Sequence, residues 1–277
     1  MKKIFTLLLL AVVTVVSGQN IIGSQSLELK KSQWYFRSLL APDSREMQLV
    51  AFVADRQKVH ALRYNGAVFF TDSLSANRPE SRFQDMAGYS YSQGNASVYW
   101  ASQDAKEFEV QSFDFGNRAV VQKHFSMDKD DRVLASYSER DRFYLVTLPE
   151  GEKDVIRLYS FNGGEPERND VDFSAFSFAT TSGKKTTLRE LLKDNGLQKI
   201  DERTMTDLAT ASGRIKLYSM NGTLLLTLDH NSDATQAFII GPDFTITQKI
   251  IAQPAFTEKA DGNSFYHEGK LYQLRVN

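Results

Sequence analysis

Two short groups of aromatic side chains are the residues of this sequence whose types and spacing best suit a binding site. Tyr89 and Tyr91 alternate along one extended segment, and Tyr99 and Trp100 lie on the next. Aromatic rings combine a large flat surface with a polar edge, so they can stack on sugars or contact peptides. Alternating aromatic residues also fill the interior between sheets. Tyr89, Tyr91, Tyr99 and Trp100 are therefore the candidate ligand-binding residues, with packing inside the sheets as the competing interpretation.

No local motif supplies a catalytic residue. Residues 182–187 resemble a phosphate-binding loop, but that loop requires a glycine five positions before its Gly-Lys pair and a hydroxyl residue after the lysine. Phe178 and Lys185 occupy these two positions. Ser126 and Lys129 have the Ser-x-x-Lys spacing of penicillin-recognising enzymes, yet the partner motifs of those enzymes are missing. The sequence therefore leaves the catalytic residues of any enzyme reaction unknown.

The sequence also contains no metal-binding motif and no cofactor signature. Its four histidines are too far apart along the chain to form a local motif: His60, His124, His230 and His267. Asp128, Asp130 and Asp131 place carboxylate oxygens at close spacing, but the central glycine and terminal glutamate of a calcium loop are missing. We therefore expect neither a metal nor a cofactor.

The composition is that of an ordinary folded protein. The chain has 277 residues, of which 42% are hydrophobic and 24% charged, with 33 basic and 34 acidic side chains and no cysteine. This balance excludes collagen-like and disordered classes, and the missing cysteines exclude disulfides, thiol nucleophiles and thiolate zinc sites. Nucleic-acid binders usually carry a basic surplus, so we expect no nucleic-acid partner.

Residues 1–18 are typical of a secretory signal peptide. Two lysines precede an apolar run at 4–16, and a small Ser-Gly pair ends at Gly18. The apolar run is shorter than the roughly 20 residues that a membrane-spanning helix needs. We predict cleavage after Gly18, export to the periplasm, outer surface or extracellular space, and no membrane span afterwards. An uncut N-terminal anchor is the alternative, and residues 19–277 are expected to form a single domain.

The remainder of the chain consists of short aromatic and β-branched runs separated by turn residues, which predicts β-hairpins. Five hairpins are expected: 49–53 with 59–64, 88–91 with 97–100, 133–137 with 143–147, 223–228 with 236–240, and 264–267 with 271–276. The Asn-Gly pair at Asn221 and Gly222 predicts a further tight turn, because both central positions of such a turn need positive φ.

The spacing of these hairpins indicates a repeated unit. Their turn centres are separated by 38, 46, 92 and 37 residues and lie at Arg56, Gly94, Arg140, Ser232 and Gly269. An additional turn near Gly183 would bring every interval to between 37 and 49 residues. That length is typical of a four-stranded propeller blade, which spans about 40 to 50 residues. The sequence therefore predicts an all-β, β-propeller-like array of about five or six four-stranded units.

Two further features concern the completeness of this array. Residues 187–196 have a capping-box pattern, three leucines on one face and a terminal Asn-Gly pair, which predict one short helical insertion. The last hairpin has no third or fourth strand after it, so we expect the segments 26–30 and 33–39 to complete the final unit. A chain truncated relative to a longer parent is the alternative, and a β-sandwich or open meander is the fallback fold.

The repeated aromatic hairpins, such as 133–137 with 143–147, and the lysine-start signal peptide resemble uncharacterised exported β-propeller-like proteins of Bacteroidetes-type bacteria. The resemblance covers residues 45–277 and concerns the fold only, so it does not fix a function. We expect a binding or scaffolding protein at the cell envelope or outside the cell, with a carbohydrate, peptide or protein partner at one end of the sheets.

Two other functions stay open. A polysaccharide-active hydrolase or lyase would need two carboxyl groups about 5 to 9.5 Å apart in a deep pocket at the propeller axis. No sequence motif is required for that chemistry, so the sequence does not separate it from binding. A degenerate relative without independent activity is the third interpretation.

Overall fold

The structure, a computed structural model, describes residues 24–30, 35–43, 45–201, 205–231, 233–253 and 261–276. Antiparallel strands dominate it, which confirms the expected all-β fold. The predicted signal peptide, 1–18, lies outside the described residues. Within them, no helix has the length and apolar character needed to cross a membrane.

Three consecutive sheets each contain four antiparallel strands in sequence order. Sheet 1 consists of β1 (Arg37–Asp43), β2 (Gln48–Ala54), β3 (Lys58–Tyr64) and β4 (Phe70–Asn77). Sheet 2 consists of β5 (Phe83–Ser92), β6 (Asn95–Ser102), β7 (Glu107–Asp114) and β8 (Ala119–Ser126). Sheet 3 consists of β9 (Arg132–Glu139), β10 (Arg142–Leu148), β11 (Val155–Phe161) and β12 (Glu167–Asp172).

The fourth sheet and a C-terminal hairpin continue the array. Sheet 4 consists of β15 (Gln198–Ile200), β16 (Ile215–Met220), β17 (Thr223–Leu228), β18 (Ala234–Ile240) and β19 (Ile246–Ala252). Its β15 pairs parallel to β16, and the other strands pair antiparallel. The C-terminal hairpin consists of β20 (Asp261–His267) and β21 (Lys270–Val276). A small hairpin between sheets 3 and 4 consists of β13 (Phe178–Ala179) and β14 (Lys185–Thr186).

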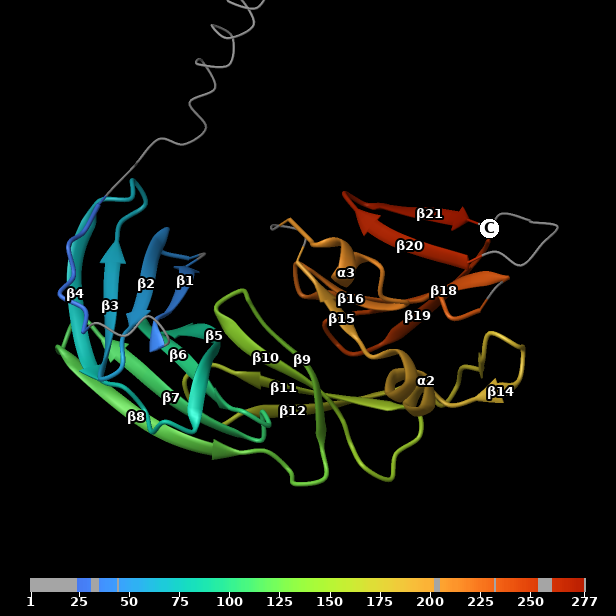
Figure 1. Cartoon of the computed structure of the whole chain (residues 1–277), viewed down its shortest axis with the longest axis horizontal. Coiled ribbons are helices and arrows are strands. Elements are labelled where there is room, and N and C mark those ends of the chain that lie inside the picture. Colours follow the sequence, from blue (N-terminus) through green and yellow to red (C-terminus); the bar gives the residue numbers. More distant parts are fainter. Residues whose placement is uncertain are drawn as a thin grey trace, which may run out of the picture.

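The sheets follow one another along an arc, which gives the propeller-like arrangement (Figure 1). The first strand of each sheet contacts the first strand of the next, from β1 to β5, β9 and β15. A separate hydrophobic core fills each interface between successive sheets, and a smaller one lies between sheet 4 and the C-terminal hairpin. Each unit therefore buries its apolar faces only against its neighbours, as expected for a repeat fold.

All five hairpins predicted from the sequence are present. They correspond to β2–β3, β5–β6, β9–β10, β17–β18 and β20–β21. The Asn-Gly turn between β16 and β17 has φ values of 52° at Asn221 and 86° at Gly222, both in the left-handed region that this turn requires. Local turn chemistry thus placed the strand pairs correctly.

The predicted spacing, however, mixed turns of two kinds. Arg56 lies between the second and third strands of its sheet, whereas Gly94 and Arg140 lie between first and second strands. Ser232 lies outside the described residues. The turn expected near Gly183 is present, with φ of 80°, but it joins only the two-residue strands β13 and β14. It therefore does not mark a four-stranded unit.

The predicted helix is present as α2 (Leu188–Asn195), which begins at a capping box formed by Thr187 and Glu190. Its three leucines are buried in the core between sheets 3 and 4. A second short helix, α3 (Leu208–Ala211), begins at Asp207 and was not expected from the sequence. Both helices lie beside sheet 4 (Figure 1).

The expected closure of the array by N-terminal strands is wrong. The sequence predicted that 26–30 and 33–39 complete the last unit, but β1 pairs along its whole length with β2 in sheet 1. Residues 24–30 form no strand. The physical reason is packing, because Ala41 is fully buried and Leu39 partly buried in the core between sheets 1 and 2.

A glycine in β5 lets sheets 2 and 3 approach closely at their first strands. A Cβ atom on Gly88 would lie 2.3 Å from Cδ2 of Phe143 and 2.7 Å from Oγ of Ser138. That hydroxyl accepts a hydrogen bond from the backbone N–H of Tyr89 at 2.7 Å. Any side chain at Gly88 would push these strands apart, so this position sets the width of the junction between β5 and β9.

Candidate functional site

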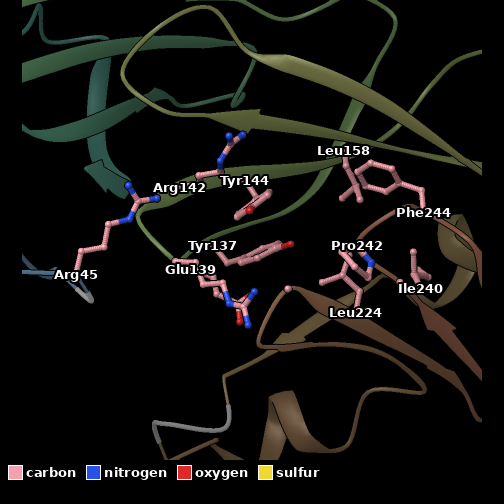
Figure 2. Close-up of a pocket in the computed structure, with 13 residues that line it drawn as sticks. Arg45, Tyr137, Glu139, Arg142, Tyr144, Leu158, Leu224, Ile240, Pro242 and Phe244 are labelled. Carbon is pink, nitrogen blue, oxygen red and sulfur yellow. The ribbon is translucent and has the colours of Figure 1, made fainter. Parts of the chain in front are cut away.

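A cavity of about 320 Å³ lies where turns of sheets 1, 3 and 4 meet. We call it the Tyr–Arg cavity. Its lining combines three arginines with two tyrosines and one carboxylate: Arg45, Arg140, Arg142, Tyr137, Tyr144 and Glu139. The apolar part of the lining comes mainly from sheet 4: Leu158, Leu224, Ile240, Pro242 and Phe244. Figure 2 shows the apolar side chains at one end of the cavity and Arg45 at the other.

The two tyrosines form a stacked pair at the centre of the cavity. Tyr137 on β9 and Tyr144 on β10 are direct cross-strand partners, with ring centroids 4.9 Å apart and an interplanar angle of 13°. The ammonium group of Lys199 lies over the ring of Tyr137, 5.0 Å from its centroid. The Tyr137 ring is therefore contacted by both an aromatic ring and a cation.

The hydroxyl groups of both tyrosines are available for hydrogen bonding. Burial raises the pKa of Tyr137 and Tyr144, so both phenols keep their protons at neutral pH. Among the described residues, neither Tyr137 nor Tyr144 makes a side-chain hydrogen bond. Each phenol can therefore donate one hydrogen bond and accept others from a ligand.

Arg140 differs from the other two arginines of the cavity. Arg45 pairs with Asp141 at 3.0 Å, and Arg142 pairs with Glu167 at 2.8 Å. Arg140 is exposed and has no ion-pair partner in the described part of the chain. Its guanidinium group lies against the Asn-Gly turn of sheet 4. The neighbouring turn thus supports the cation without neutralising it.

The turn that carries Arg140 is strained. Arg140 and Asp141 have φ values of 47° and 64°, in the left-handed region that ordinary side chains avoid. The corresponding turns at 93–94, 221–222 and 268–269 have glycine at their second position. Strain of this kind, of order 1 kcal/mol or more per residue, tends to be retained at functional sites. The turn between β9 and β10 therefore differs from these three turns, because both of its left-handed residues carry side chains.

A second cavity, of about 510 Å³, lies among the first strands of the sheets. We call it the axial cavity. Tyr137 lines both cavities, and Tyr89, Lys199 and Asp201 also line the axial one. Asp201 is the only carboxylate of this lining, as Glu139 is of the Tyr–Arg cavity. Neither cavity brings together two carboxyl groups from the described residues.

The four aromatic residues proposed from the sequence lie mainly in the core. Tyr99 and Trp100 are fully buried, and Tyr99 stacks on Phe143 with centroids 4.5 Å apart. Tyr91 is 7% exposed and Tyr89 8% exposed. Tyr89 is the member of this set that lines the axial cavity. Burial favours packing for Tyr91, Tyr99 and Trp100, and the binding role of the set stays a prediction.

Sequence reasoning missed Tyr137, Tyr144 and Arg140, although a signal was present. The predicted hairpin of 133–137 with 143–147 places Tyr137 and Tyr144 on the same face, and the segment 139–142 between them reads Glu-Arg-Asp-Arg. An aromatic cross-strand pair beside a charged turn could have been recognised. What the sequence did not reveal is that sheet 4 faces this pair.

Two of the three carboxylates considered for calcium pair with an arginine. Asp131 and Asp128 accept hydrogen bonds from Nη1 of Arg157 at 3.0 and 3.4 Å, and Asp170 accepts from its Nε at 2.7 Å. Among the described residues, no group of three or more His, Asp or Glu side chains could hold a metal ion. The guanidinium group of Arg157 therefore supplies the positive charge beside Asp128, Asp131 and Asp170.

Comparisons with known proteins identify no family. No family model matches the chain, and no curated protein matches it. A prolyl endopeptidase structure aligns over 87% of this chain with 12% identity and a TM-score of 0.42, and the chain spans about a third (33%) of that protein. An uncharacterised protein from Listeria monocytogenes aligns over 87% of this chain and 77% of its own, with 10% identity and a TM-score of 0.34.

A further similar structure is a GH43 endo-arabinanase from Bacillus licheniformis. It aligns over 90% of this chain and 96% of its own, with 9% identity and a TM-score of 0.30. At such low similarity, the fold is defined by the strand order and cores described above. Function has to be inferred from the chemistry of the cavities.

Proposed function

We propose that this chain is a binding protein whose Tyr–Arg cavity holds an acidic peptide segment. The observation that carries the proposal is the exposed guanidinium of Arg140, which has no ion-pair partner among the described residues and lies beside two tyrosines without side-chain hydrogen bonds. Arginine recognises carboxylates by paired, charge-assisted hydrogen bonds. The phenols offer hydrogen bonds to peptide amides or carbonyls.

The polarity of the cavity favours a peptide over a carbohydrate. The apolar end, which includes Leu224, Ile240 and Phe244, suits an aliphatic side chain next to the acidic one. Sugars bind aromatic rings through open ring faces, but Tyr137 already stacks on Tyr144 and has the ammonium group of Lys199 over its ring. The best match is therefore an extended segment with an acidic residue beside an apolar one.

Replacing Arg140 with glutamine is expected to weaken binding of such a peptide about 10- to 150-fold. A hydrogen bond to a charged group contributes about 1.5–3 kcal/mol, and about 1.4 kcal/mol corresponds to a factor of ten in affinity. Calorimetry with N-acetylated tetrapeptides that carry one aspartate beside one leucine would measure the change. The matched control is Arg132→Gln, because Arg132 is exposed at the opposite end of β9.

A double-mutant cycle sharpens this test. Replacing the aspartate of the peptide with asparagine should lower its affinity for the natural protein. The same replacement should lower its affinity for the Arg140→Gln variant only slightly, because both changes remove the same interaction. Tight binding of acidic oligosaccharides without binding of any acidic peptide would contradict the proposed ligand class. Equal affinity of Arg140→Gln and Arg132→Gln would contradict the site.

The polysaccharide hydrolase or lyase is the second candidate, and no observation favours it. That chemistry needs two carboxyl groups flanking the scissile bond. Glu139 and Asp201 are the single carboxylates of the Tyr–Arg and axial cavities among the described residues. Binding without catalysis is therefore the function that the geometry supports better.

Export is part of the proposed function. It is supported by the lysine pair, apolar run and small residues of 1–18. The exported protein is expected to begin at Gln19, which N-terminal sequencing of the mature protein would measure. A mature protein that keeps residues 1–18 would contradict cleavage and favour the uncut anchor.

A further inference from the structure

The C-terminal hairpin is a two-stranded sheet, in contrast to the larger sheets before it. In sheets 1, 2 and 3, the second strand pairs with a third strand, which pairs with a fourth. In the hairpin, β20 is the strand partner of β21, and the other edge of β21 has none among the described residues. An unpaired edge presents a row of backbone N–H and C=O groups that can accept another strand.

The outward face of β21 is mainly apolar, with Lys270 at one end. Tyr272, Leu274 and Val276 are 54%, 66% and 55% exposed, although all three are hydrophobic. Leu208 on α3 extends this surface and borders a cavity of about 520 Å³ together with Tyr272 and Leu274. A continuous exposed apolar surface beside an open strand edge is typical of an interaction site.

The hairpin is firmly attached to sheet 4, so this edge is preformed. The backbone N–H and the hydroxyl of Ser264 both donate to the buried carboxylate of Asp229 at 2.8 Å. The amide of Gln273 donates to Thr235 at 3.1 Å from the inward face of β21. The backbone of β21 therefore has little freedom to lose when another strand pairs with it.

We propose that the partner on this edge is the β21 strand of a second copy of this chain, paired antiparallel about a two-fold axis at Gln273. Gln273 is the central residue of the seven in β21, so this register pairs the whole strand with itself. Tyr272 then lies opposite Leu274 of the other copy on the outward face. The four strands of the two hairpins form one continuous sheet.

Charge and side-chain alternation favour this register over a shift by one residue. With the axis at Gln273, Lys270 lies opposite Val276 and Arg275 lies opposite Leu271, so no like charges face each other. A shift by one residue can place Lys270 opposite Arg275, and it also puts the apolar faces of the two copies on opposite sides of the sheet. A two-fold pairing is self-complementary and stops at two copies. This inference does not depend on the ligand of the Tyr–Arg cavity.

The oligomeric state of the purified protein tests the proposal. Light scattering after size exclusion, over a concentration series, is expected to show a dimer. Leu274→Lys should weaken the dimer at least tenfold, because it places a cation on each copy in the apolar surface. Val121→Lys is the matched control, since Val121 is equally apolar and is 52% exposed on sheet 2. Circular dichroism would show that both variants keep their sheets.

Cysteine cross-linking tests the register, because the chain contains no cysteine. Tyr272→Cys and Leu274→Cys are expected to form an intermolecular disulfide when mixed, since directly opposite residues lie about 4.5–5.5 Å apart. Either variant alone should cross-link poorly, because identical residues would be more than about 7 Å apart. A monomer at all concentrations, larger open assemblies, or cross-linking by one variant alone would overturn the proposal.

Discussion

Replacing Asp229 with alanine is expected to lower the free energy of unfolding by about 3–5 kcal/mol. The side chains of Asp229 and Lys216 are fully buried between sheet 4 and the C-terminal hairpin, with Nζ and Oδ2 3.4 Å apart. Asp229 also accepts hydrogen bonds from Thr235 and Ser264. The alanine variant leaves the hydroxyls of Thr235 and Ser264 without this acceptor. It also leaves the buried ammonium group of Lys216, which keeps Oδ1 of Asn263 as an acceptor, without a counter-charge. Urea unfolding followed by circular dichroism would measure the loss.

Two controls identify the cause of this effect. Asp130→Ala removes an exposed carboxylate and should change the free energy of unfolding by about 0.5 kcal/mol or less. Adding Lys216→Met to Asp229→Ala should recover part of the loss, because the uncompensated charge is removed. If Asp229→Ala proves no more harmful than Asp130→Ala, the buried pair has no important structural role.

Raising the pH above 10 is expected to destabilise the fold steeply. Burial raises the pKa of Tyr91 and Tyr99 above the ordinary value of 10.0, and burial together with Asp131 raises the pKa of Tyr159 to about 12. The folded protein therefore keeps protons that the unfolded chain loses above pH 10. The stabilisation is fully present below pH 10 and, for Tyr159, is lost as the pH rises towards 12.

The size of this effect follows from the number of protons. Each tyrosine that ionises only on unfolding lowers stability by about 1.4 kcal/mol per pH unit, so Tyr91, Tyr99 and Tyr159 together give about 4 kcal/mol per pH unit. Tyr137 and Tyr144, whose pKa burial also raises, add to this slope in the same direction. Urea unfolding at a series of pH values would measure the slope, and Tyr159→Phe should reduce it by about 1.4 kcal/mol per pH unit. A stability that does not change between pH 9 and 11 would contradict the assignment.

The strand pairs could be predicted from sequence because hairpins are encoded locally. Turns such as Asn221 with Gly222 require backbone angles that few residues adopt, and the alternating runs on either side fix the register. The closure of the array could not be predicted in the same way. Whether β1 completes sheet 1 or a distant sheet depends on which neighbour buries Ala41, and no local pattern records that choice.

The candidate site was harder to predict for a related reason. Tyr99 and Trp100 are adjacent on β6 and point to opposite faces, and an ordinary two-layer sheet would leave one of them exposed. Sheet 2, however, lies between sheets 1 and 3. Trp100 packs into the core with sheet 1, and Tyr99 packs into the core with sheet 3. Accessibility at this position is decided by the stacking of sheets rather than by the strand itself.

The left-handed conformation of Arg140 and Asp141 bears on how far this molecule can be adapted to heat. Glycine in place of Asp141 would relieve strain at the turn, but it would also remove the carboxylate that anchors Arg45. Thermal stability and the ordered position of the Arg45 guanidinium group therefore place opposite demands on residue 141. Variants selected only for survival at high temperature are expected to gain glycine there and to lose the ion pair that holds Arg45.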